Sequence, residues 1–87
     1  MSASQVQRLF DTVYRGQRNF MTPVLVRYGV AGPYGYELSR GKGLAGEPIF
    51  GVTFLRLDGG RPDPSINQLF TSVLDADNYI REVRDEH

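Results

Sequence analysis

The chain has 87 residues, with ten basic and ten acidic side chains and no cysteine. This length predicts one domain over residues 1–87, and a hydrophobic content of 40% is that of a globular chain rather than a disordered one. Formal neutrality excludes a global field that would steer the protein to nucleic acid or to a membrane. The lack of cysteine excludes disulfides and thiolate metal sites, and we expect a cytoplasmic protein without a membrane segment.

The first predicted element is an amphipathic helix over residues 4–15. Ser4 and Gln7 have the spacing of a capping box, and Gly16 is a natural helix stop. The apolar residues fall at the i, i+3, i+4, i+7 spacing of one helical face: Val6, Leu9, Phe10, Val13 and Tyr14.

Three β-rich segments follow. Residues 24–28 predict a first strand, and residues 29–33 a turn. Tyr34, Tyr36 and Leu38 alternate with smaller or polar residues, which is the period of a half-buried second strand. After a glycine-rich connection over 41–48, residues 49–57 form the longest β-like run, and both of its faces carry apolar side chains. This pattern predicts a central strand.

The last third of the chain predicts a loop, a short strand and a helix. Asp58-Gly59-Gly60 and Pro62-Asp63-Pro64 indicate turns and an exposed loop. Residues 66–71 predict a short fourth strand. Ser72 has the position of an N-cap, and residues 73–85 show helical apolar spacing.

The predicted order is α-β-β-β-(β)-α. The connections between strands are too short for parallel crossovers, so the sheet is predicted to be an antiparallel meander of three to four strands. We expect an α+β two-layer sandwich, flanked by an N-terminal and a C-terminal helix, with both helices on one face of the sheet.

A glycine-rich segment, Gly41-Lys42-Gly43-Leu44-Ala45-Gly46, has the G-x-G-x-x-G spacing of phosphate-binding loops. A dinucleotide site needs a helix after this segment, whereas here a strand is predicted. Two interpretations therefore stay open, anion binding and a flexible hairpin in which glycines supply positive φ.

Basic and aromatic residues interleave on the first two predicted strands and mark a candidate partner-binding hairpin. Such a pattern is typical of surfaces that bind single-stranded nucleic acid, where the bases stack on aromatic rings. The alternation with Leu38 instead favours burial of the tyrosines in a core. The exposed loop adds two charged candidates to this set. The candidate residues are Arg27, Tyr28, Tyr34, Tyr36, Arg40, Lys42, Arg61 and Asp63.

The sequence offers few side chains that could act as catalytic groups. The single histidine, His87, is the C-terminal residue, and no carboxylate pair has the spacing to converge on one helix face. We therefore expect no enzymatic activity, no cofactor and no metal. The hypothesis is a small adaptor, regulator or inhibitor that binds another protein through a sheet edge or the Arg/Tyr hairpin. The alternative is a nucleic-acid-binding domain that uses this hairpin, and a homodimer is a further expectation.

Overall fold

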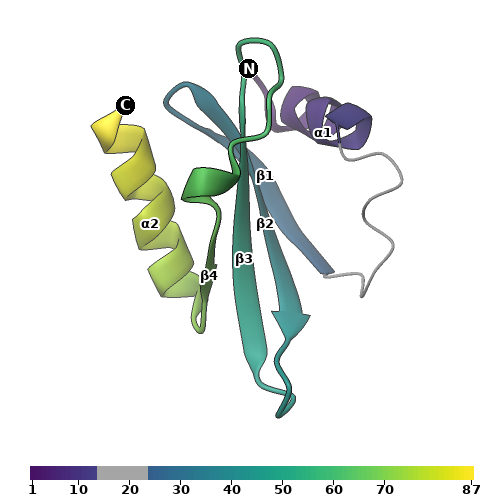
Figure 1. The fold of residues 1–87 in the computed structure, drawn as a ribbon, viewed down its shortest axis with the longest axis vertical. Helices are drawn as coiled ribbons and strands as arrows, with labels where there is room; N and C mark the ends of the chain where they lie inside the picture. Colours follow the sequence, from purple (N-terminus) through teal and green to yellow (C-terminus); the bar gives the residue numbers. More distant parts are fainter. Residues whose placement is uncertain (14–23) are drawn as a thin grey trace.

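The computed structural model describes residues 1–13 and 24–87. Four strands form one antiparallel sheet in the order β1-β2-β3-β4 (Figure 1). This arrangement confirms the predicted α+β fold with a meander between an N-terminal and a C-terminal helix. The elements in chain order are α1 (Ala3–Val13), β1 (Val24–Ala31), β2 (Tyr34–Lys42), β3 (Pro48–Arg56), the 3-10 helix η1 (Pro64–Ile66), β4 (Gln68–Phe70) and α2 (Val73–Glu86).

The first hairpin is tighter than predicted. Residues 29–31, expected in a turn, continue β1 and pair with β2, so the connection consists of Gly32 and Pro33 alone. Gly32 has a φ of 60°, which a glycine adopts without steric cost and which two-residue hairpin turns require. The prediction placed the turn too early because Gly29 resembles a turn residue, although its φ is not positive.

The second hairpin, β2–β3, is the longest feature of the sheet. Its register runs without interruption from Tyr34 opposite Arg56 to Lys42 opposite Pro48. Gly41 and Lys42 therefore belong to a strand rather than to the predicted loop. The tip of this hairpin reaches beyond β4 and α2 at the lower end of the molecule (Figure 1).

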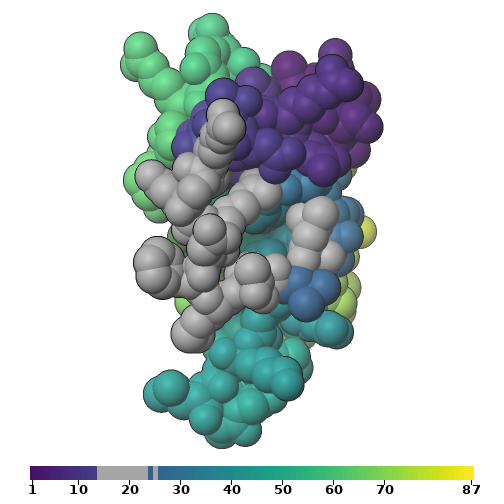
Figure 2. Space-filling view, turned by 90° about the vertical axis from the view of Figure 1, so that its right-hand side faces the viewer, coloured from purple at the N-terminus to yellow at the C-terminus, as the bar shows by residue number. Residues whose placement is uncertain are grey.

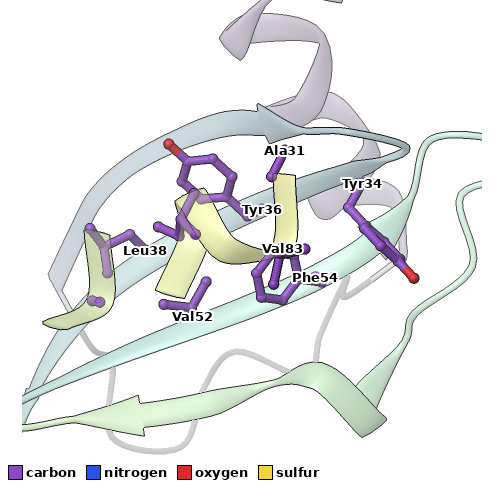
Figure 3. Packing of buried hydrophobic residues seen from close by; sticks show 9 residues of the cluster. Ala31, Tyr34, Tyr36, Leu38, Val52, Phe54 and Val83 are labelled. Atoms are coloured by element: carbon purple, nitrogen blue, oxygen red, sulfur yellow. The ribbon is translucent and has the colours of Figure 1, made fainter. Parts of the chain in front are cut away.

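The main core lies between the sheet and α2. Tyr36, Leu38, Val52 and Phe54 converge beneath the helix (Figure 3), because alternate residues of neighbouring strands share one sheet face. The sheet and α2 thus pack as two layers around the main core. The buried residues of this cluster are Ala31, Tyr34, Tyr36, Leu38, Val52, Phe54, Ala76, Ile80 and Val83.

The expectation that both helices cover one face is wrong. A second buried cluster of Val6, Phe10 and Leu55 places α1 on the opposite side of the sheet from α2 (Figures 1 and 2). The reason lies in β3, where the consecutive residues Phe54 and Leu55 are both fully buried. Because consecutive strand residues point to opposite faces, each face needs its own cover.

A serine side chain caps the start of each helix. At α1 the reciprocal capping pair is Ser2 with Gln5, where each backbone N–H donates to the other side chain, and not the predicted Ser4 with Gln7. Both pairs have the capping-box spacing, so the sequence could not choose between them. At α2 the predicted N-cap is confirmed, since the Asp75 N–H donates to Ser72 Oγ at 3.1 Å. The predicted stop at Gly16 lies outside the described residues.

Candidate protein-interaction surface

Arg27 is the centre of a polar cluster that joins β1, β2 and α2. Its Nε donates a hydrogen bond to the Tyr36 hydroxyl oxygen at 3.0 Å, and its Nη2 forms an ion pair with Asp77. The hydrogen bond with Tyr36 and the bond to Asp77 raise the pKa of Arg27, so this guanidinium stays charged at any physiological pH. The cluster thus anchors the N-terminal half of α2 to β1.

A polar groove of about 360 Å³ opens beside this cluster, between β1 and α2. We call it the arginine groove. Three guanidinium groups and one carboxylate lie in its lining, which gives it a positive balance. Its lining residues are Arg27, Val30, Tyr36, Asp77, Ile80, Arg81 and Arg84.

The groove contains three charged residues that sequence analysis missed. Asp77, Arg81 and Arg84 have the spacing i, i+4, i+7, which places them on one stripe of α2. This stripe lies next to the apolar stripe of Ala76, Ile80 and Val83. The spacing was a usable signal, but only the tertiary structure shows that the stripe faces β1.

The predicted tyrosines do not share one surface. Tyr34 and Tyr36 are buried beneath α2, with 4% and 7% of their surface exposed, and the hydroxyl of each lies at the edge of the cluster (Figure 3). Tyr28 packs on the other side of the sheet against Phe10, at a ring centroid distance of 5.6 Å. Stacking with nucleic-acid bases needs an exposed ring face, and Tyr34 and Tyr36 do not offer one.

Arg40 and Lys42 are exposed near the free end of the β2–β3 hairpin, away from the arginine groove. Arg40 pairs across the sheet with Val24 at the start of β1 and with Phe50 in β3. The structure therefore separates these two cations from Arg27, with which the sequence had grouped them.

The loop with Arg61 and Asp63 is tied back to β3. The Arg56 N–H donates to the Arg61 carbonyl oxygen at 2.7 Å, and the Asp63 N–H donates to that of Phe54 at 3.2 Å. The Asp63 carboxylate accepts hydrogen bonds from the hydroxyls of Ser65 and Tyr34, at 2.5 and 3.3 Å. The bond from Ser65 is the main cause that lowers the pKa of Asp63. Asp63 is thus bound within the fold, whereas the Arg61 side chain is exposed.

The glycine-rich tip already holds a carboxylate of its own. The Ala45 N–H donates to Glu47 Oε2 at 2.9 Å, and the Gly43 N–H donates to the Glu47 carbonyl oxygen at 2.8 Å. A Cβ at Gly43 would lie 1.8 Å from Glu47 Oε1, so the exposed carboxylate would have to move if position 43 carried a side chain. The Ala45 amide is thus bonded to the Glu47 carboxylate and the Gly43 amide to a backbone carbonyl of the same hairpin, which favours the hairpin interpretation.

The two outer strands differ in length and in side chains. β1 spans eight residues and pairs with β2 alone within the described part of the chain. Three of its valines are exposed, Val24, Val26 and Val30, at 60%, 42% and 39%. β4 spans only three residues, and exposed Leu69 and half-buried Phe70 lie in it. β1 is therefore the longer of the two outer strands.

No protein-family model, curated protein or solved structure matches the chain. Within residues 1–13 and 24–87, no group of three or more His, Cys, Asp or Glu side chains could hold a metal ion. Neither α1 nor α2 is long and apolar enough to cross a membrane. The ring of His87 packs edge-on against Tyr34, with 5.2 Å between the centroids.

Proposed function

We propose that this protein is a non-enzymatic interaction module that binds a partner protein by adding an extended segment of that partner to β1. The main support for this proposal is the eight-residue edge strand with three exposed valines. An edge strand directs unpaired backbone groups outward, and an added strand satisfies them while its side chains supply specificity.

Two features of β1 support this role. Proteins protect long edge strands with charges, prolines and bulges, and β1 has one bulge near its start, between Leu25 and Arg27. From Arg27 to Ala31 its pairing with β2 is regular, and this stretch contains no proline and one charge. The regular half of β1 is thus a suitable template for a further strand.

Nucleic-acid binding through the hairpin is less well supported. The tyrosines that would stack bases are buried, and Arg40 and Lys42 lie apart from Arg27. The positive groove carries a carboxylate, Asp77, in its lining. A peptide partner fits these features better than a chain with a phosphate on every residue.

The test is selection of random decapeptides displayed on phage against the wild-type protein. The selected peptides are then titrated against Val26→Lys/Val30→Lys, because lysines on an edge strand oppose strand addition. The matched control is Val73→Lys/Leu74→Lys, which changes two exposed apolar residues at the start of α2. We expect about tenfold weaker binding to the β1 variant alone. Equal binding to both variants, or no selected peptide, contradicts the proposal.

A further inference from the structure

We propose that the partner is an extended acidic peptide, whose Asp or Glu side chains enter the arginine groove and bind Arg81 and Arg84 while its backbone pairs with β1. This inference rests on the proposed function and names the chemistry of the partner.

Geometry places the groove within reach of a strand added to β1. A new strand would lie about 4.8 Å from β1, and every second side chain of it would point to the face that α2 covers. The groove lies on this side, because its lining combines Arg27 and Val30 of β1 with Arg81 and Arg84 of α2. Two acidic side chains separated by one residue could therefore enter the groove together.

Two of the three arginines in the groove have a weak ion pair or none among the described residues. Arg27 is already paired with Asp77. Among the described residues, the side chain of Arg84 bonds to its neighbour Asp85 alone, at 3.0 Å, and both side chains are more than half exposed, so this pair contributes little. Arg81 is exposed and has no ion pair among the described residues. Guanidinium groups bind carboxylates in a bidentate manner, which suits acidic side chains of a peptide.

A second copy of the chain is a poorer occupant of this site. The sequence of β1, Val24–Ala31, contains no acidic residue, and its one charge is Arg27. Two copies joined through β1 would bring Arg27 rather than a carboxylate toward Arg81 and Arg84. Charge complementarity therefore favours an acidic partner of another kind.

The decapeptides selected on the wild-type protein are sequenced, and their affinity is measured by fluorescence polarisation. We expect Asp or Glu at two positions separated by one residue. Binding should weaken about tenfold for Arg81→Glu/Arg84→Glu and should also weaken at high salt. Arg8→Glu is the matched control, since Arg8 is exposed on α1 at the opposite face of the sheet.

The possible outcomes distinguish binding of an acidic peptide in the groove from strand addition to β1 alone. Peptides that lose binding to Val26→Lys/Val30→Lys but keep it with Arg81→Glu/Arg84→Glu would overturn the acidic partner and leave the β1 edge in place. The same holds for selected peptides without acidic residues. A wild-type dimer in light scattering that Val26→Lys/Val30→Lys dissociates would make a second copy the occupant. Preference for single-stranded DNA over the peptides, lost in Arg81→Glu/Arg84→Glu, would assign the groove to nucleic acid.

Discussion

Gly29 of β1 lies directly opposite Tyr36 of β2, and the tyrosine ring occupies the space that a side chain at position 29 would need. A Cβ at Gly29 would lie 2.4 Å from the Tyr36 hydroxyl oxygen and 2.5 Å from Cζ. The Tyr36 hydroxyl oxygen in turn accepts the hydrogen bond from Arg27, the centre of the polar cluster. Gly29 therefore leaves room for the ring of Tyr36, and Tyr36 lines the arginine groove.

Gly29→Ala is expected to destabilise the protein by about 1–3 kcal/mol, because the tyrosine ring must leave its place in a packed core. The measurement is urea unfolding followed by circular dichroism. Gly41→Ala is the matched control, since Gly41 is also a strand glycine but a Cβ added there would meet no atom within 4 Å. We expect the control to change stability by less than about 0.5 kcal/mol. Equal effects of the two substitutions would contradict the packing argument.

Phe10→Ala is expected to release α1 while the main core stays folded. Phe10 is fully buried in the small cluster with Val6 and Leu55, and an eleven-residue helix is marginal without such packing. Hydrogen exchange should show lost protection in α1 and retained protection in β3 and α2. Arg8→Ala, an exposed change on the same helix, should leave both regions protected. Equal loss of protection in α1 and α2 would mean that the two clusters unfold as one.

Ser72→Ala is expected to cost about 1 kcal/mol of stability, because the Asp75 N–H at the start of α2 loses its acceptor. Thermal unfolding gives the measurement. Ser72→Asp should restore most of the loss, since aspartate accepts the same bond and favours the positive helix end. Thr71→Ala, one residue earlier and exposed, serves as the control. A Ser72→Ala protein as stable as the control would rule out the cap.

Tyr79→Phe is expected to change how stability depends on alkaline pH. Burial is the main cause that raises the pKa of Tyr79 above 10.0, and Glu86 and Glu82 add to it. A raised pKa means that the stabilising effect is complete below about pH 10 and is lost as the pH rises through the folded-state pKa. The hydroxyl donates to the Ile66 carbonyl oxygen at 2.6 Å, so the variant should lose about 1 kcal/mol at neutral pH.

The difference between wild type and Tyr79→Phe should therefore shrink above about pH 10. The other tyrosines titrate in both proteins, so the difference in the free energy of unfolding reports Tyr79. Urea unfolding at neutral pH and at several alkaline pH values tests this. A difference that stays constant, or that grows with pH, would contradict the expected sign.

The sequence was informative where a local pattern has one structural solution. Period-two alternation in Tyr34, Tyr36 and Leu38 predicted both the strand and the buried face, and all three side chains are buried. The helix predicted over 73–85 is α2, Val73–Glu86, within one residue. The short strand predicted over 66–71 is β4, Gln68–Phe70, preceded by the 3-10 turn η1. Its boundaries were less sharp because Pro64 begins a turn that the apolar pattern does not reveal.

Local patterns with two solutions gave the errors. Ser2 with Gln5 and Ser4 with Gln7 have the same spacing, and only the hydrogen bonds show which pair caps α1. Gly29 was placed in a turn because glycine is common there, whereas the structure uses it to make room for Tyr36. In both cases the deciding contact lies outside the short window that the pattern covers.

By itself, the sequence determined the order of the elements, the antiparallel meander, the cap of α2 and the apolar face of each helix, since these depend on residues close together in the chain. The tertiary structure decided which side of the sheet each helix covers and which charges meet. Arg27 and Asp77 are 50 residues apart, and their ion pair exists only because α2 packs beside β1. Helical and strand periods show which side of an element is apolar, but the partner of that side is chosen by packing between elements distant in sequence.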